Sequence, residues 1–196
     1  DINDKVEQEY SEGRYWPEPL IQINPNYRRS ATVQQLAAKG DLHAACAELF
    51  KAKKPEGTPV DLFLYAHQME ALAKAGQDKS YVVTTGTGSG KSLSFFIPII
   101  DRILKAKQAD PKSRTRAIVI YPMNALATDQ ARRIADALTR IPSLHGVRAG
   151  LYADAQPDNP AHEMTEDSVI THRETMRKNP PDILLTNYKM LDYLLL

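Results

Sequence analysis

The spacing of apolar residues along the chain predicts helices first and an alternation of strands and helices later. Residues 32–40 have helical spacing, with Thr32 and Gln35 placed for an N-terminal capping box and Gly40 placed to end the helix. Residues 41–54 have the same spacing and finish in lysines, which suit the negative end of a helix. The first part of the chain therefore predicts short helices.

Residues 53–59 are rich in lysine, proline and glycine, a composition that predicts a linker. The apolar pattern changes on the two sides of this stretch. We therefore expect residues 1–60 to form a mostly helical accessory segment and residues 61–196 to form a separate lobe.

Within that lobe, short apolar runs predict four strands, at residues 80–85, 116–122, 147–153 and 182–187. Helical patterns precede, separate or follow them at residues 62–77, 91–108, 125–141 and 189–196. Pro98 falls inside the second of these helices and should kink or restart it. Nearly continuous apolar strands that alternate with helices predict an α/β fold, with a parallel sheet covered by helices on both faces.

Composition changes this picture little. Charged residues make up 25% of the chain and apolar residues 42%, which is typical of a globular protein, and the net charge of +1 does not by itself indicate a nucleic-acid partner. The single cysteine, Cys46, excludes an internal disulfide and is expected to be a buried, unreactive thiol. We expect a cytoplasmic protein without a membrane segment, because no apolar run reaches the length that crosses a bilayer.

The sequence TTGTGSGKS lies between a predicted strand and a predicted helix, where a phosphate-binding loop is found. Glycines allow backbone N–H groups to turn towards an anion at the positive end of the following helix. Lys91 would reach the β- and γ-phosphates, and the hydroxyl of Ser92 would bind Mg²⁺. Thr85 occupies the position where the strict motif has its first glycine. The expected nucleotide contacts of this loop are Thr85, Gly86, Thr87, Gly88, Ser89, Gly90, Lys91 and Ser92, with Lys91 and Ser92 as the catalytic pair.

Two residues on the preceding helix are candidates for contacts to the base. The amide of Gln68 can both donate and accept, which matches the edge of adenine, and Tyr65 lies one helical turn earlier. A surface glutamine and a half-buried tyrosine are the alternative interpretation.

Together these stretches resemble superfamily two helicases of the DEAD/DEAH-box type. LYAHQ is similar to the Q-type motif, TGTGSGKS to motif I, YPMNALATDQ to motif Ia and PPDILLTNYKMLDYLLL to the motif Ib region, in the order of the family from residue 64 to residue 196. The residues of these motifs most resemble those of the MrfA-like branch of DNA helicases, which includes helicases of bacterial anti-phage defence. The resemblance implies a RecA-like lobe that binds ATP and Mg²⁺, here truncated, and a nucleic-acid partner, with DNA favoured over RNA.

The resemblance also implies which residues contact nucleic acid. In the family, the loops at the strand ends hold the sugar-phosphate backbone, and short hydroxyl and amide side chains suit contacts that do not depend on base sequence. Asn124 stands where relatives often have Arg or Lys, which removes one charged contact. The candidate residues are Pro122, Asn124, Arg173, Thr186 and Asn187.

The acidic box of the family does not occur before Leu196. We therefore expect this chain to be the N-terminal piece of a larger helicase, whose remainder supplies the acidic box and a second RecA-like lobe. The piece alone is expected to bind ATP without hydrolysing it. Two alternatives remain: a translocase subunit that moves on duplex DNA in a restriction or defence complex, and a non-hydrolysing scaffold lobe. Other subunits of a defence system are candidate partners.

Overall fold

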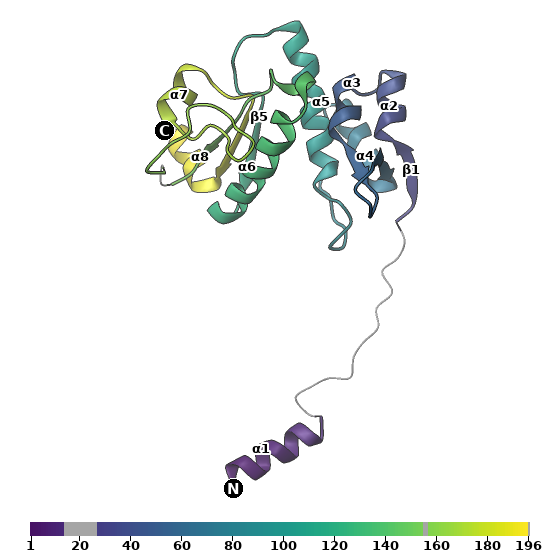
Figure 1. Ribbon diagram of the computed structural model, residues 1–196, viewed down its shortest axis with the longest axis vertical. Coiled ribbons are helices and arrows are strands. Elements are labelled where there is room, and N and C mark those ends of the chain that lie inside the picture. Colours follow the sequence, from purple (N-terminus) through teal and green to yellow (C-terminus); the bar gives the residue numbers. More distant parts are fainter. Residues whose placement is uncertain (14–26, 155–156, 196) are drawn as a thin grey trace.

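The computed structural model describes residues 1–13, 27–154 and 157–195 (Figure 1). In the first of these ranges, helix α1 (Ile2–Ser11) has no buried residue. The other two ranges form an α/β structure in which helices pack on a small parallel sheet.

The predicted capping box is confirmed at the start of helix α2 (Val33–Lys39). The Thr32 hydroxyl accepts a hydrogen bond from the Gln35 N–H, and the Gln35 side chain accepts one from the Thr32 N–H. Gly40 ends the helix with φ +82°, a left-handed conformation that glycine adopts without strain. Helix α3 (Ala44–Leu49) follows and packs on α2.

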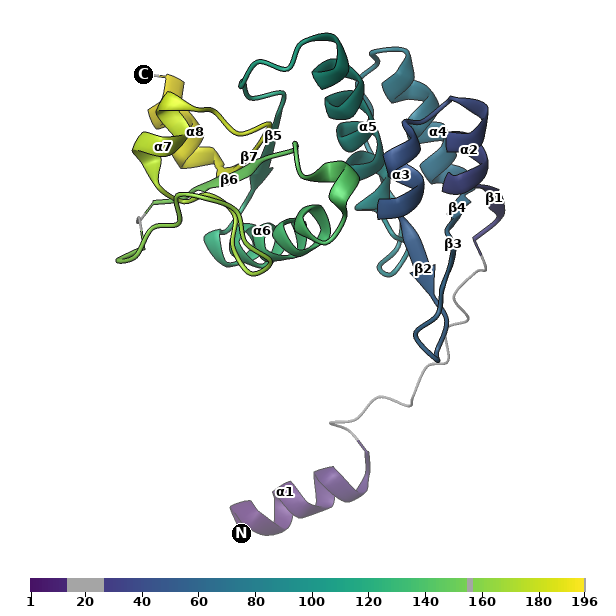
Figure 2. The same cartoon turned by 45° about the horizontal axis from the view of Figure 1, so that its top comes forward.

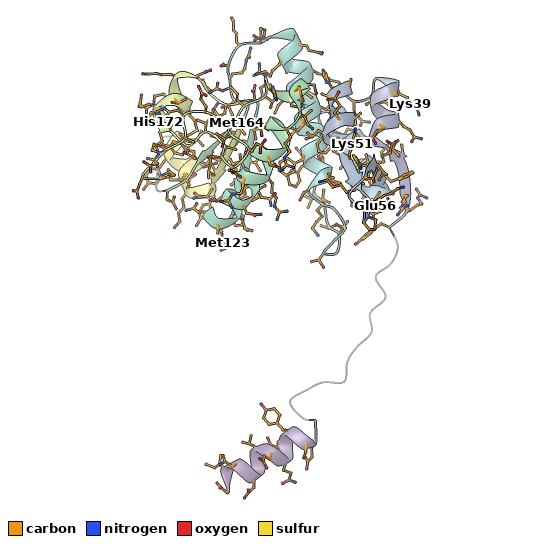
Figure 3. All side chains as sticks on the ribbon, viewed as in Figure 1. Lys39, Lys51, Glu56, Met123, Met164 and His172 are labelled. Carbon is orange, nitrogen blue, oxygen red and sulfur yellow. The ribbon has the colours of Figure 1, made fainter. Side chains whose placement is uncertain are left out.

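The predicted linker is wrong, because its residues form the turn of an antiparallel hairpin. Strand β2 (Lys51–Lys53) pairs with β3 (Pro59–Asp61), and Figure 3 labels Lys51 in β2 and Glu56 in the turn. Gly57 has φ +85°, and its N–H donates to the carbonyl of Lys54. A glycine that can take a positive φ is what such a turn requires, so the same composition suits a tight turn as well as a linker.

Main-chain hydrogen bonds connect the two sides of residue 60. Strand β1 (Arg29–Thr32) pairs antiparallel with β4 (Phe63–Tyr65), and the Ala66 N–H donates to the carbonyl of Arg28. The accessory segment is thereby attached directly to the start of helix α4 (Ala66–Gly76).

Helix α5 (Leu93–Ala109) lies beside α4 and contributes much of the core. Its side chains of Ile97, Ile100 and Ile103 are at most 4% exposed. In Figure 1 this helix stands between the accessory elements and the sheet. It therefore holds the two halves of the described structure against one another.

Pro98 does not interrupt α5. Because proline has no N–H, the carbonyl of Ser94, four residues earlier, lacks its usual helical donor. The hydroxyl of Tyr81 donates to this carbonyl at 2.7 Å instead. The segment ahead of the glycine-rich loop is thus bound to the helix that follows it.

Three of the four predicted strands form one parallel sheet. Its order is β5–β7–β6, and the register aligns Tyr121 with Asn187 at one end and Ala117 with Ile183 at the other. The strands are β5 (Ala117–Tyr121), β6 (Ala149–Tyr152) and β7 (Ile183–Asn187). The short helix η1 (Pro142–Leu144) precedes β6, and α8 (Tyr188–Leu195) follows β7.

Helices lie on both sides of this sheet, but they cover its second face only in part, because Ile118 and Ile120 of β5 are 50% and 49% exposed. Helix α6 (Asn124–Thr139) packs on all three strands, and Figure 2 shows it running alongside them. Helix α7 (Arg173–Lys178) covers the other face at β6. A Cβ on Gly150 would lie 2.7 Å from the Met176 Sδ and 2.9 Å from the Pro181 Cγ, so a larger residue here would force these neighbours to move.

Residues 80–85, the fourth predicted strand, have no strand assignment. A strand needs a neighbour for its backbone hydrogen bonds, and no described segment pairs with these residues. Val82 is accordingly 87% exposed. The predicted strand is therefore wrong for the described structure, although the loop that it leads into is formed.

Candidate nucleotide and nucleic-acid sites

The glycine-rich segment, residues 84–92, forms a turn directly ahead of α5, and we call it the nucleotide loop. Gly88 and Gly90 have φ +77° and +70°. Among the described residues, none accepts a hydrogen bond from the backbone N–H groups of residues 86–92. Helix α5 begins at Leu93, so the positive end of its dipole lies next to the nucleotide loop. Unpaired amides beside a helix N-terminus can bind an anion such as a phosphate.

Three side chains of the nucleotide loop form hydrogen bonds within the loop itself. The Lys91 ammonium donates to the carbonyls of Thr85 and Gly86, both at 2.8 Å. The hydroxyls of Thr85 and Ser89 lie 2.5 Å apart, so the threonine in place of the first glycine forms a hydrogen bond within the loop. Ser92 is exposed and makes no side-chain cap on α5, so its hydroxyl is accessible to a metal ion.

Gln68 is buried beneath the nucleotide loop and is 1% exposed. Its Oε1 accepts from the Tyr65 N–H at 2.8 Å, and its Nε2 donates to the carbonyl of Gly90 at 2.9 Å. A Cβ on Gly90 would lie 2.7 Å from this Nε2, so the amide can reach the loop only because residue 90 is glycine. Both polar atoms of Gln68 therefore bind backbone in this structure.

An aromatic cluster lies beside the loop, and it contains two residues that the sequence analysis missed. The Tyr27 ring centroid lies 5.3 Å from that of Tyr65 and 5.5 Å from that of His67. The Tyr27 hydroxyl would lie 3.2 Å from a Cβ on Gly86, and His67 Nε2 bonds the carbonyl of Ser89 at 3.1 Å. No motif surrounds Tyr27; only the β1–β4 pairing brings it here. His67 could have been found, since it directly precedes Gln68.

The second site is at the carboxyl ends of the parallel strands, where predicted nucleic-acid residues meet. Asn124 Nδ2 donates to Asp154 Oδ2 at 2.8 Å. Asn187 Nδ2 donates to Asn124 Oδ1 at 2.6 Å and to Asp154 Oδ1 at 3.3 Å. Asn187 is the last residue of β7, the central strand, so its side chain reaches Asn124 after β5 and Asp154 after β6. We call Asn124, Asp154 and Asn187 the strand-tip cluster.

The remaining candidates surround this cluster. Thr186 Oγ1 donates to the carbonyl of Tyr152 at 2.8 Å. Arg173 Nη2 donates to the carbonyls of Ala153 and Asp154, at 2.9 and 3.1 Å, with its guanidinium over the Tyr152 ring. Pro122 is exposed in the bend between β5 and Met123, which Figure 3 labels at the start of α6.

Asp154 was not predicted, although it lies two residues after strand β6, much as Asn124 lies three residues after β5. Hydrogen bonds from Asn124 and Asn187 hold the pKa of its carboxyl below the usual value. The carboxyl is therefore ionised at neutral pH. A search of strand ends for any polar side chain, acidic ones included, would have found it.

The described residues contain no group of three or more His, Cys, Asp or Glu side chains placed to bind a metal. None of the helices in the same residues is both long and apolar enough to cross a membrane. Cys46 is buried, as predicted, and burial raises its pKa to about 12.

Known proteins are similar in sequence and fold. Residues 65–196 match the family model described as DEAD/DEAH box helicase. Druantia protein DruE of Escherichia coli (strain UMEA 4076-1) is 37% identical over 122 residues, which cover 59% of this chain and 6% of DruE. ATP-dependent helicase HRQ1 of Saccharomyces cerevisiae (strain ATCC 204508 / S288c) is 36% identical over 107 residues, covering 54% of this chain and 9% of HRQ1.

Two crystal structures of DUF1998 helicase MrfA have a similar fold. One is bound to DNA and AMPPNP, with a TM-score of 0.54, and the other is bound to DNA, with a TM-score of 0.58. Each is 21% identical and covers 94% of this chain, which corresponds to 22% and 21% of the MrfA chains. This chain thus spans less than a tenth of the two sequence relatives and about a fifth of MrfA.

Proposed function

Because this chain belongs to the DEAD/DEAH box helicase family, we propose that it is the ATP-binding lobe of an ATP-dependent nucleic-acid helicase or translocase. One observation carries the proposal: the N–H groups of residues 86–92 have no acceptor among the described residues and lie directly ahead of α5. An arrangement of this kind binds the phosphates of a nucleotide.

The nucleotide loop holds the phosphates of ATP through these amides, from Gly86 to Ser92. Lys91 exchanges the carbonyls of Thr85 and Gly86 for β- and γ-phosphate oxygens, which are stronger acceptors because they are charged. The accessible hydroxyl of Ser92 holds Mg²⁺. Bound Mg²⁺ neutralises charge on the phosphates during transfer.

The base of ATP lies against the aromatic cluster of Tyr27, Tyr65 and His67, because stacked or tilted rings offer a flat apolar surface to a purine. Gln68 contributes by shaping the nucleotide loop, since its amide already binds Tyr65 and Gly90.

The strand ends bind the backbone of nucleic acid through Pro122, Asn124, Arg173, Thr186 and Asn187. All of these side chains except Pro122 are short or planar donors gathered at one edge of the sheet, which suits phosphate contacts without base recognition. DNA is the favoured substrate, and the solved MrfA structures bound to DNA support this choice.

Other parts of the complete protein supply the acidic box and the second RecA-like lobe, and residues 1–60 act as an accessory segment. The similarity to DruE makes other subunits of a defence system candidate partners. A second candidate function is translocation on duplex DNA without strand separation, because translocase subunits of restriction or defence complexes share the same motifs. We assign the protein to the cytoplasm, where a free cysteine such as Cys46 is stable.

The test is nucleic-acid-stimulated ATP hydrolysis by the full-length protein, comparing Lys91→Ala with Lys79→Ala. Lys79 is exposed in the segment ahead of the loop, so its loss is a matched control. We expect Lys91→Ala to abolish hydrolysis and Lys79→Ala to retain it. Hydrolysis by Lys91→Ala at the wild-type rate would refute the proposal, and strand-displacement and duplex-translocation assays would separate the two candidate functions.

A further inference from the structure

The donors that the proposed function assigns to nucleic acid all bind one short segment of this chain. Asn124 and Asn187 donate to the carboxylate of Asp154. Thr186 and Arg173 donate to backbone carbonyls of residues 152–154. The end of β6 therefore occupies the side-chain donors that a nucleic-acid backbone would need.

The carboxylate of Asp154 is the part of this segment that resembles a nucleic-acid ligand. Its Oδ2 accepts from Asn124 at 2.8 Å, and its Oδ1 accepts from Asn187 at 3.3 Å. The two non-bridging oxygens of a backbone phosphate also form a flat, charged pair of acceptors, and they bind the same donors. Two amides that hold one carboxylate thus have the chemistry to hold one phosphate.

The amides can face only one way in this arrangement. Asn187 Oδ1 accepts from the Met190 N–H at the start of α8, and Asn124 Oδ1 accepts from Asn187. A carboxylate only accepts, so both Nδ2 groups must turn towards it. The donors are therefore already oriented for an anion before any nucleic acid arrives.

The side chain of Asp154 can leave while its backbone stays in place. Arg173 holds the carbonyls of Ala153 and Asp154, and Thr186 holds the carbonyl of Tyr152. Asp154 itself is exposed, so water surrounds the position to which the carboxylate would rotate. Departure of the carboxylate needs only rotation of the side chain.

We propose that Asn124 and Asn187 form a site for one backbone phosphate of nucleic acid, and that the Asp154 carboxylate fills this site in the free protein. Nucleic acid then binds by displacing the carboxylate, which makes Asp154 a built-in competitor. The inference rests on the proposed function, because it concerns the same edge of the sheet.

The competitor is charged under working conditions, since its pKa is held low by the same two hydrogen bonds. Displacement therefore separates the carboxylate from its donors and leaves it near an incoming phosphate of like charge. Both effects weaken binding, so removal of the carboxylate should strengthen it.

The experiment measures the affinity of the full-length protein for a labelled single-stranded DNA by fluorescence anisotropy. Asp154→Ala and the isosteric Asp154→Asn are compared with wild type and with Asp192→Asn. Asp192 is exposed on α8, and its variant makes the same change of charge outside the strand-tip cluster. We expect both Asp154 variants to bind DNA about three- to tenfold more tightly, on the scale of one charge-assisted hydrogen bond. Asp192→Asn should change affinity less than about twofold.

Weaker or unchanged DNA binding by both Asp154 variants, or an equal gain from Asp192→Asn, would overturn the inference. Asn124→Ala and Asn187→Ala distinguish this failure from failure of the proposed function. If these two variants bind DNA less tightly while the Asp154 variants show no gain, the edge binds nucleic acid but Asp154 does not compete. If they bind DNA as wild type does, the nucleic-acid assignment itself fails. Melting temperatures identify any variant that is unfolded, and Asp154→Asn keeps the shape of the original side chain.

Discussion

Replacement of Gln68 by glutamate would change one group at the centre of the proposed nucleotide site while keeping its shape. The carboxylate can still accept from the Tyr65 N–H, but its second oxygen would face the carbonyl of Gly90 in place of a donor. The carbonyl of Ser89 lies near the same position, at 3.5 Å from the present Nε2. An attractive contact therefore becomes a repulsive one beneath the nucleotide loop.

The size of the effect follows from burial. Gln68 is 1% exposed, so water cannot replace the lost bond. A buried polar group left without its partner costs about 1–3 kcal/mol. If that energy opens the nucleotide loop, ATP affinity falls by roughly 5- to 150-fold. Protonation would restore a donor to Gly90, and burial raises the pKa of such a carboxyl, so part of the affinity should return between about pH 8 and pH 6.

The assay is binding of a fluorescent ATP analogue across this pH range, expressed as the ratio of variant to wild type so that titration of ATP cancels. Gln77→Glu makes the same change on an exposed side chain at the end of α4 and should have little effect. GTP gives a second comparison: if Gln68 acts through the loop, ATP and GTP binding weaken equally. Wild-type affinity of Gln68→Glu for both nucleotides at every pH, with no change in melting temperature, would refute this reasoning.

Two further predictions concern stability and reactivity. Asp182 is 2% exposed and accepts from Arg116 at 2.6 Å and from Lys107 at 2.9 Å, so Asp182→Ala leaves buried charge unpaired and should lower the free energy of unfolding by about 3–5 kcal/mol in denaturant titrations. Asp129→Ala, which removes exposed contacts to Arg133 and Gln130, should cost less than about 1 kcal/mol. Burial raises the pKa of Cys46 from 9.0 to about 12, so its protonated thiol should react with a disulfide reagent only on unfolding, and rapid labelling of the native protein would contradict this. Because the folded state keeps this proton longer, stability should fall as pH rises above about 9.

The elements that the sequence predicted best are those whose pattern is local. The Thr32–Gln35 box needs only residues three positions apart, and the strands at Ala117, Ala149 and Ile183 are continuous apolar runs. Residues 80–85 have an equally good β pattern but no strand neighbour among the described residues. Pairing depends on distant parts of a chain, which a local pattern cannot contain.

The candidate sites divide in the same way. The nucleotide loop is contiguous, so its residues could be named from one motif. Tyr27 reaches that loop only because β1 pairs with β4, and Asp154 reaches Asn187 only because β6 lies beside β7. The match of an amide to the adenine edge suggests a base contact for Gln68, which stays a prediction, and nothing in the sequence indicated that both polar atoms of this amide bind backbone in the structure. The sequence could predict which kinds of group a side chain is able to bind, but it could not predict which of those groups the fold places beside it.

Pro98 has a consequence for how ATP would be received. Because Pro98 leaves the Ser94 carbonyl free to accept from the hydroxyl of Tyr81, this hydrogen bond joins the two ends of residues 81–94 and makes a closed ring that contains the nucleotide loop. Burial raises the pKa of Tyr81, so this hydroxyl keeps its proton and the fastening persists in alkaline solution. A ring of this kind has fewer unbound conformations to give up, which lowers the entropy cost of wrapping a triphosphate. A residue usually regarded as a helix breaker would here prepare a loop for its ligand.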